Sequence, residues 1–264
     1  MKKKSTEQVE VAVIEVKHGQ ARFALLGESP IIMNRMSEKA KHELLFPLGR
    51  KTAADKAQNL KHNPLEEFRA SPHRIADEGA ATLLAMPSTA FKKAIGVAAL
   101  DMPGGAKKAQ IGRLTYIAEE YVPIFGIPCL KMDVVRSADM SHTPDIRTRA
   151  AVKQWAALVT ISYIQPVLND KTVMNLMAGA GMMVGVGDWR PEKGAGSFGR
   201  FRLVNADDPD FLDLVNNAGR KAQLQAMKTP EAYDTETEEL LVWFNIEVDK
   251  RGKKGMLVEK GGDG

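Results

Sequence analysis

A stretch rich in glycine and cationic residues, from 179 to 202, holds the side chains best suited to bind a ligand. Seven of the 21 residues from 179 to 199 are glycine. Glycine adopts positive φ and lets a second backbone come close, and guanidinium or ammonium groups bind phosphate. The cationic residues of the stretch are Arg190, Lys193, Arg200 and Arg202. We therefore expect a loop that holds a polyanion near the main chain; the alternative is a long irregular loop without a ligand.

The segment from Trp189 to Lys193 is the strongest local candidate. In a binding site, Arg190 and Lys193 would contact phosphates, and Trp189 would stack on a base or pack on a neighbouring subunit. In the alternative interpretation, Trp189 anchors the loop in the core and Glu192 neutralises Lys193. The exposure of the Trp189 ring distinguishes the two.

Three further pairs of residues are candidate contacts with nucleic acid: Lys92 and Lys93, Asn34 and Arg35, and Arg147 and Arg149. The lysine pair lies at the start of a predicted helix, where backbone amides favour an anion. Asn34 and Arg35 follow a predicted strand, and the arginine pair enters another strand, where it would line a groove. The alternatives are a solvated helix face for the lysines, a turn for Asn34 and surface charge for the arginines.

Residues for acid–base catalysis are sparse. His142 and Asp145 share a predicted loop, with Asp133 and Asp139 just upstream. No second histidine lies at a spacing typical of a catalytic pair, and no acidic triplet or phosphate-binding P-loop occurs. The sequence therefore favours binding over catalysis.

Metal and cofactor sites are not indicated either. His62 and His73 have no spacing to other ligands that would suggest a metal site. Gly185 and Gly187 follow a predicted helix rather than a strand, so they do not form a dinucleotide motif. The one cysteine, Cys129, excludes an internal disulfide and a cysteine metal cluster. We expect no cofactor.

The composition is that of a globular protein with mildly basic charge. The chain has 264 residues, of which 44% are hydrophobic and 27% charged, and its net charge is +4. Basic charge agrees with a nucleic-acid partner, although part of it lies in the runs 2–4 and 250–255. No apolar run approaches the roughly 18 residues of a membrane span, and no signal-peptide core follows the first residues. We expect a cytoplasmic protein without membrane contact.

Hydrophobic periodicity divides the chain into strands and helices. Alternation predicts strands at 9–17 and 21–26, separated by a turn at 18–20, and further strands at 83–87, 114–117, 122–127, 154–164 and 198–204. Helices are predicted from Ser37 to about residue 45, from a Ser88 cap onward, from Asp170 and from about Pro209. Residues 46–84 are predicted to be a mobile, partly helical insertion, and 136–149 a loop. A possible strand at 240–248 follows a charged linker and precedes the basic tail.

This element order predicts an α+β fold. Two βαβ-type halves with antiparallel pairing would form a ferredoxin-like sheet with helices on one face. The main domain then covers residues 1–208, with 46–84 as an inserted segment. Residues 209–264 form a C-terminal part that holds a helix, a possible strand and the basic tail.

Three stretches share the order and spacing of a known set of motifs. They are residues 26–32 (Leu-Gly-Glu-Ser-Pro-Ile-Ile), residues 86–95 (Met-Pro-Ser-Thr-Ala-Phe-Lys-Lys-Ala-Ile), and residues 185–187 with 196–201 (Gly-Val-Gly and Gly-Ser-Phe-Gly-Arg-Phe). Together they resemble the RAMP superfamily, the RRM-like proteins that include the backbone subunits of CRISPR effector complexes. The family's glycines are absent at the helix start, where Ser88 directly follows Pro87. The resemblance covers roughly residues 21–204, and the forms Ser-Pro-x-Ile-Met-Asn-Arg and Gly-Asp-Trp-Arg-Pro-Glu-Lys-Gly bring it closest to uncharacterised RAMP-like proteins encoded by phages.

The resemblance implies an RRM-like sheet with a thumb-like insertion. Backbone subunits of that family polymerise along single-stranded RNA, and the thumb displaces a base at intervals. In that arrangement the glycine-rich loop lies beside Lys92, Lys93 and the turn at Asn34 and Arg35. The implied protein is a non-catalytic binder of single-stranded nucleic acid that forms a homo-oligomer or helical filament. RNA is favoured and DNA remains open, because contacts to the phosphate backbone carry no sequence information.

Three alternatives stay open at this stage. Some RAMP relatives cleave RNA, through a histidine pair or through an aspartate in a loop, which makes a RAMP-type endoribonuclease the first alternative. A protein that coats or anneals single-stranded DNA in phage recombination is the second. The third is an assembly protein whose glycine-rich loop holds a neighbouring subunit.

Overall fold

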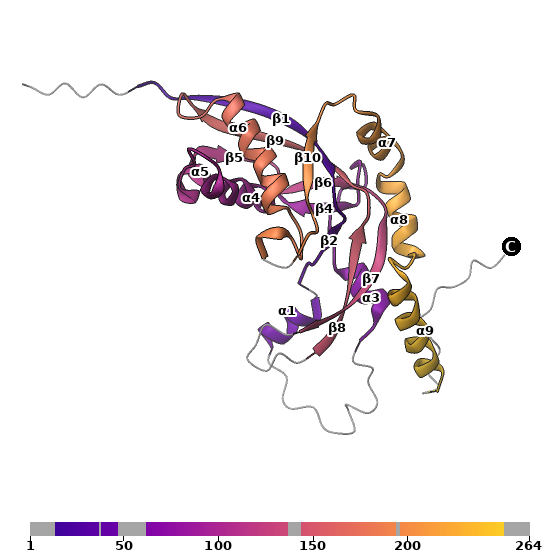
Figure 1. Cartoon of the computed structure of the whole chain (residues 1–264). Helices are drawn as coiled ribbons and strands as arrows, with labels where there is room; N and C mark the ends of the chain where they lie inside the picture. Colours follow the sequence, from indigo (N-terminus) through magenta and orange to yellow (C-terminus); the bar gives the residue numbers. More distant parts are fainter. Residues whose placement is uncertain (1–13, 37, 47–61, 137–143, 194–195, 251–264) are drawn as a thin grey trace, which may run out of the picture.

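The chain folds as a mixed α+β structure built on antiparallel sheets (Figure 1). The computed structural model describes residues 14–36, 38–46, 62–136, 144–193 and 196–250. Its strands are β1 (Lys17–Gly27), β2 (Ile31–Met33), β3 (His73–Arg74), β4 (Leu84–Pro87), β5 (Thr115–Tyr116), β6 (Tyr121–Phe125), β7 (Pro128–Arg136), β8 (Pro144–Val152), β9 (Ala156–Gln165) and β10 (Phe201–Val204). Its α-helices are α1 (Glu38–Leu45), α3 (Pro64–Ala70), α4 (Ser88–Asp101), α5 (Lys108–Leu114), α6 (Asp170–Gly179), α7 (Pro209–Asn217), α8 (Arg220–Lys228) and α9 (Thr235–Lys250). The predicted α+β class is confirmed.

Two sheets divide these strands. The larger has seven strands in the order β10-β1-β9-β6-β4-β3, with β5 paired to β9. The smaller has the order β2-β8-β7. Among the described residues, no helix is long and apolar enough to cross a membrane.

Strands β1 and β9 form the centre of the larger sheet. They pair without interruption from Lys17 with Gln165 to Leu26 with Ala156. On β9 the alternate residues Ala157, Val159, Ile161 and Tyr163 are buried, as the alternation in the sequence predicts, because successive side chains of a strand point to opposite faces.

The turn predicted at 18–20 is wrong, because these residues continue β1 and pair with β9. Gly19 lies against the ring of Tyr163, where an added Cβ would approach the ring to 2.4 Å. Glycine here leaves room for a buried aromatic ring and does not mark a reversal of the chain. The predicted strand at 9–17 lies mostly outside the described residues, and 14–16 precede β1 without joining it.

Helices cover both faces of the larger sheet. Phe91 and Ile95 of α4 are buried in the main core with Met177 of α6. On the opposite face, Phe211 of α7 packs in a second cluster with Leu26 of β1. The expectation of helices on one face only is therefore wrong, because β1 carries apolar side chains on both faces and each needs cover.

Strands β7 and β8 form a long hairpin that pairs from Pro128 with Val152 to Arg136 with Pro144. The loop predicted at 136–149 is therefore wrong for residues 144–149, which belong to β8. That segment is polar, but its Arg149 pairs with Asp133 of the neighbouring strand at 2.8 Å. Because charged side chains of β7 and β8 pair with each other, the sequence of this part of β8 shows no apolar alternation. Residues 137–143 lie outside the described part.

The C-terminal part packs beside β7 through α8 and α9. The strand expected at 240–248 is wrong, because residues Thr235–Lys250 form one helix. Asp234 caps that helix: its carboxylate accepts hydrogen bonds from the backbone N–H and the hydroxyl of Thr237, at 2.9 and 2.6 Å. The cap and the helical burial of Thr237 and Val248 outweigh the strand preference of single residues.

Several other boundaries differ little from expectation. Helices are confirmed near 38–45, 170–179 and 209–217, and α3 is the helical part of the insertion. At the start of α4, Pro87 takes the cap position and Ser88 is the first helical residue, with no cap from its side chain. The helices α5 and α8 were not predicted. Ser37 and residues 47–61 lie outside the described part.

Candidate functional site

A pocket of about 360 Å³ lies where the glycine-rich loop meets the start of α4 and the turn after β2. Its apolar wall includes Met33, Met86, Pro87, Ala90 and Val186. Its polar groups come from four segments and are Asn34, His73, Thr89, Lys93, Asp188, Arg190 and Glu192. Three of the predicted contact residues, Asn34, Lys93 and Arg190, therefore line one cavity although they lie far apart in the sequence.

Glycines shape the loop that forms one side of this pocket. Gly185, Gly187 and Gly199 all have positive φ, between 71° and 85°. An added Cβ on Gly199 would lie 1.7 Å from the carbonyl oxygen of Val186. The loop is tied to the turn after β1 by the Gly199 N–H, which donates to the carbonyl of Pro30 at 2.7 Å. These glycines close the loop tightly against the sheet, so at these positions they serve the backbone rather than a ligand.

Trp189 is the one residue other than glycine with positive φ (53°) in the described chain. Its ring packs edge-on against Phe198, with centroids 6.4 Å apart, and the Arg149 guanidinium lies 5.5 Å from its centroid. The residue nevertheless keeps 40% of its surface exposed. Trp189 is therefore not a buried core residue: it contacts Phe198 and Arg149 within the protein and leaves part of its surface open to a ligand.

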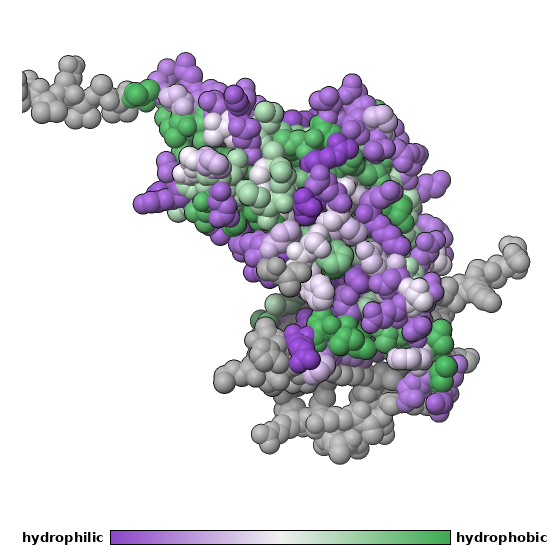
Figure 2. Space-filling model, in the orientation of Figure 1, coloured by the Kyte–Doolittle hydropathy of each residue, from purple (hydrophilic) through white to green (hydrophobic). Residues whose placement is uncertain are grey.

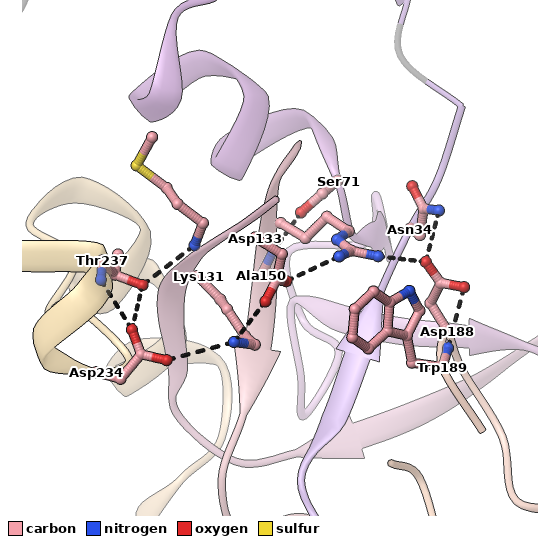
Figure 3. Close-up of polar contacts among 11 residues, drawn as sticks. Asn34, Ser71, Lys131, Asp133, Ala150, Asp188, Trp189, Asp234 and Thr237 are labelled. Carbon is pink, nitrogen blue, oxygen red and sulfur yellow. Dashed lines mark hydrogen bonds and ion pairs between the residues drawn. The ribbon is translucent and has the colours of Figure 1, made fainter. Parts of the chain in front are cut away.

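A chain of ion pairs links Asp188, which lines the pocket, to Asp234 just before α9 (Figure 3). Arg149, whose side chain is only 3% exposed, contacts Asp188 at 2.5 Å and Asp133 at 2.8 Å. Asp133 also binds Lys131 at 2.7 Å, and Lys131 reaches Asp234 at 3.3 Å. Burial of such charges is tolerated only with close partners. Arg149 therefore holds the hairpin to the glycine-rich loop and does not line a groove as we expected.

The carboxylate of Asp188 connects this chain to the pocket. It accepts a hydrogen bond from the Asn34 side-chain amide at 2.9 Å, and its second oxygen accepts one from the Trp189 backbone N–H at 3.1 Å. Sequence reasoning missed Asp188. The available signal was that it is the only acid between residues 179 and 191.

Arg190 is neutralised by its neighbour Glu192. Its Nε donates to the carboxylate at 2.8 Å, and its Nη1 donates to the Gly187 carbonyl at 2.9 Å. Burial opposes ionisation of Glu192, but the hydrogen bond from Arg190 and the positive charges of Arg190, Lys193 and Lys93 together hold its pKa below the ordinary value. The carboxylate therefore stays charged at neutral pH, and it pairs with Arg190 rather than with Lys193.

The other predicted cations fall into two groups. Arg35 pairs with Glu38, and Arg200 lies 3.4 Å from Glu28 while its Nε donates to the Met182 carbonyl. The second group has no ion pair among the described residues and consists of Lys92, Lys93, Arg147 and Lys193. Lys92 is half-buried and the other three are exposed. Lys93 is the member of this group that lines the pocket.

His73 also lines the pocket, although no motif around it predicts a site there. Burial, and then the positive charges of Arg35 and Lys41, lower its pKa below the ordinary value of 6.5. The imidazole is therefore neutral at pH 7, with one nitrogen that donates and one that accepts. Its ring lies 5.5 Å from that of Tyr121.

The residues considered for catalysis do not gather at this pocket. His142 lies outside the described part, and Asp145 lies in β8 at 3.1 Å from His62. The other nitrogen of His62 is 3.0 Å from Glu67, so this histidine connects α3 to the hairpin. In the described ranges, no group of three or more His, Cys, Asp or Glu side chains is placed to hold a metal ion. Burial raises the pKa of the Cys129 thiol, which makes it unreactive.

The pocket combines an apolar wall with amide, imidazole and ammonium groups, which suits a ligand with both flat and anionic parts. Comparison with protein-family models gives no match, and no curated protein matches the chain with significance. The function is therefore argued from the site itself.

Proposed function

We propose that this protein is a non-catalytic binder of single-stranded nucleic acid that assembles into a polymer on its ligand. The observation that carries the proposal is the pocket itself. Asn34, Lys93 and Arg190 were each selected from separate stretches, and they line one cavity beside Trp189, which is 40% exposed. Of the three, Lys93 is the one with a charge that no ion pair neutralises among the described residues. Single strands are held in this manner, by cations on the backbone and by rings that stack on bases.

The strand order supports an RRM-like frame for this site. The elements β1, α4, β6, β9, α6 and β10 follow one another as strand, helix, two strands, helix and strand, and the four strands lie in the order β10-β1-β9-β6. This is the connectivity of a ferredoxin-like sheet. We propose that fold for the core, with residues 46–84 as the inserted thumb-like segment.

Only one side of the pocket has the unneutralised positive charge that a phosphate requires. Glu192 and Asp188 occupy the loop side and are both paired with arginines. Lys93 has no such partner among the described residues, and it extends from the second turn of α4. We therefore assign the phosphate contact to Lys93, with Lys193 and Lys92 extending the path, and the stacking contact to Trp189.

Salt dependence of binding tests this assignment. In a fluorescence anisotropy titration with labelled single-stranded RNA and DNA, we expect affinity to fall steeply as salt rises. Lys93→Gln removes one phosphate contact, so the slope of log K against log salt should fall in magnitude by about 0.7. Lys221→Gln, an exposed lysine of α8 remote from the pocket, is the matched control and should leave the slope unchanged.

Two results would contradict the proposal. One is the absence of any salt-dependent binding to RNA or DNA, which would favour an assembly protein whose loop holds a neighbour. The other is equal loss of affinity in both lysine variants, which would place the contact elsewhere. Tighter binding to DNA than to RNA would identify the single-strand coating or annealing alternative. Cleavage of RNA that Asp145→Ala abolishes would identify the endoribonuclease alternative.

A further inference from the structure

The side-chain amide of Asn34 is held in one orientation at the pocket. Its Nδ2 donates a hydrogen bond to the Asp188 carboxylate at 2.9 Å. Because an ionised carboxylate only accepts hydrogen bonds, the amide nitrogen faces Asp188 and the carbonyl oxygen points away from it, as Figure 3 shows. Asp188 is itself fixed by Arg149 at 2.5 Å and by the Trp189 N–H at 3.1 Å. Asn34 is exposed, and its oxygen has no partner among the described residues, so it is a preorganised acceptor.

The other polar groups on this side of the pocket are occupied, charged or able to donate. Both oxygens of Asp188 already accept hydrogen bonds. Glu192 is paired within its own loop and carries a negative charge that repels phosphate. His73 and Thr89 also line the pocket, but a neutral imidazole can change tautomer and a hydroxyl can rotate, so each can donate instead. The free oxygen of Asn34 can only accept, and it therefore selects a ligand that brings a donor.

One nucleotide can reach both Asn34 and Lys93. The two residues line the same cavity of about 360 Å³, which is the size of a site for one small ligand. At the centre of the view in Figure 2, where the glycine-rich loop of Figure 1 lies over β2, most surface residues are pale or purple, which marks intermediate or hydrophilic character. This surface suits sugar and phosphate groups. A nucleotide whose phosphate binds Lys93 therefore places its sugar within reach of Asn34.

Of the two kinds of nucleic-acid backbone, only RNA brings a donor. The phosphate and deoxyribose of an internal DNA nucleotide carry acceptors alone, whereas ribose adds the 2′-hydroxyl, which can donate. Donors on the bases vary with sequence. When a bound DNA strand excludes water from the pocket, the Asn34 oxygen is left without a partner, and an unsatisfied polar group costs free energy. The pocket is complementary to ribose rather than to deoxyribose.

We infer that Asn34 accepts a hydrogen bond from the 2′-hydroxyl of the nucleotide whose phosphate binds Lys93, and that this contact makes the protein select RNA over DNA. The inference rests on the proposed function, because it names the sugar that the proposed strand-binding pocket takes. It also gives the ion pair between Arg149 and Asp188 a second effect, since that pair fixes the carboxylate that orients Asn34.

Three oligouridines that differ only at the 2′ position test the contact. They carry a hydroxyl (RNA), a hydrogen (DNA) or a fluorine, and the 2′-fluoro strand keeps the sugar pucker of RNA without a donor. In anisotropy titrations at one salt concentration, the native protein should bind RNA about fivefold more tightly than either other strand, the effect of one hydrogen bond. This comparison uses the native protein alone, so it does not depend on the folding of any variant.

The variant Asn34→Ala should remove the preference. It should bind RNA about fivefold more weakly than the native protein does and leave the affinity for the other two strands unchanged, because they make no hydrogen bond to the oxygen. The matched control is Asn217→Ala in α7, where an exposed asparagine donates to Asp213 at 2.7 Å but does not line the pocket. This control should keep the full preference for RNA. Circular dichroism checks the fold of both variants.

Several results would overturn the inference. A 2′-fluoro strand that binds as tightly as RNA would assign the preference to sugar pucker. A preference that persists in Asn34→Ala would place the acceptor elsewhere, and an equal loss for all three strands would make Asn34 a phosphate contact. A native protein that binds the three strands equally would contradict this inference and leave the proposed function intact. Absence of binding to any strand would contradict the proposed function and this inference with it.

Discussion

At the scale of single residues, the arginines near the pocket form ion pairs that stabilise the fold, although their residue type suggests phosphate binding. Arg149 and Arg190 were both expected to contact phosphate, yet Arg149 is buried and Arg190 is paired within its own loop. The carboxylates that pair with each arginine explain why it does not contact a ligand. Asp133 and Asp188 are distant in sequence from the arginine that they neutralise, and no local pattern reveals such a pairing.

Asp133 is the residue on which the ion-pair chain depends. Replacement by Asn leaves Lys131 and Arg149, with side chains 9% and 3% exposed, without their shared carboxylate. Arg149 keeps Asp188 and Lys131 keeps Asp234, so neither cation is left without a partner, and the loss of the charged hydrogen bonds to Asp133 should lower the free energy of unfolding by about 2 kcal/mol. Urea denaturation measures this change. Glu119→Gln, an exposed acid, is the control and should have no effect, whereas an equally stable Asp133→Asn protein would show that the chain contributes nothing.

Replacement of Glu192 should raise the affinity for single strands, whereas replacement of Asp133 should lower stability. Its carboxylate lines the pocket and stays ionised because Arg190, Lys193 and Lys93 lower its pKa. Glu192→Gln removes a negative charge from the phosphate path and releases Arg190, so single strands should bind about fivefold more tightly, which corresponds to about 1 kcal/mol. Anisotropy titration at low salt measures it. Weaker binding by the Glu192→Gln variant would contradict this prediction, because it would mean that Arg190 binds phosphate only while Glu192 holds it in place.

At the scale of elements, helices and strands with apolar periodicity are predicted well from the sequence, and elements with polar sequences are predicted poorly. Strand β9 and helix α4 have one buried side each, so their spacing is visible in the sequence. Strand β8 and helix α9 are misjudged because their partners are charged or capping side chains, such as Asp234 on α9. Glycine is ambiguous for the same reason: Gly19 makes room for a ring, whereas Gly199 permits a turn.

The glycine-rich loop gives a prediction at this scale. Gly199→Ala places a Cβ 1.7 Å from the Val186 carbonyl at a φ of +71°, so the loop must shift and stability should fall by about 2 kcal/mol. Thermal unfolding measures this. The matched control is Gly112→Ala in α5, where no atom lies within 4 Å of the added Cβ and alanine should stabilise by about 0.5 kcal/mol. Similar melting temperatures for the two variants would contradict the strain argument.

At the scale of the whole molecule, the buried side chain of Gln223 in α8 connects the C-terminal helices to strands of the larger sheet. The Gln223 carbonyl accepts hydrogen bonds from the backbone N–H groups of Leu83 and Leu84 at 2.8 and 3.0 Å. Its amide donates to the carbonyls of Ile124 and Gly126 at 2.8 and 3.1 Å, and to that of Ala218 at 3.1 Å. The predicted division at residue 208 lies before Gln223, and a hydrogen bond from one side chain to distant strands leaves no pattern in the sequence.

Gln223→Leu tests this connection. The substitution is close in volume but removes the hydrogen bonds that Gln223 makes to five backbone groups, so the free energy of unfolding should fall by about 3 kcal/mol. The native protein should unfold in one transition by circular dichroism, because the two parts share this core. Gln225→Leu, on the exposed side of the same helix, should change stability by less than about 0.5 kcal/mol. Two separate transitions in the native protein would contradict the connection.

The pairing of β1 sets the order in which this chain can fold. β1 lies between β9 and β10, and its Ala24 pairs with Val204, 180 residues further along the chain. During synthesis β1 has no partner in the larger sheet until β9 (Ala156–Gln165) has been made, and its second edge pairs with β10 (Phe201–Val204) later still. The centre of the sheet therefore forms through contacts of high sequence separation, and folding should be slow. An unpaired strand edge is a template for pairing with another chain, so the eleven residues of β1 are open to such pairing in the nascent chain until β9 follows.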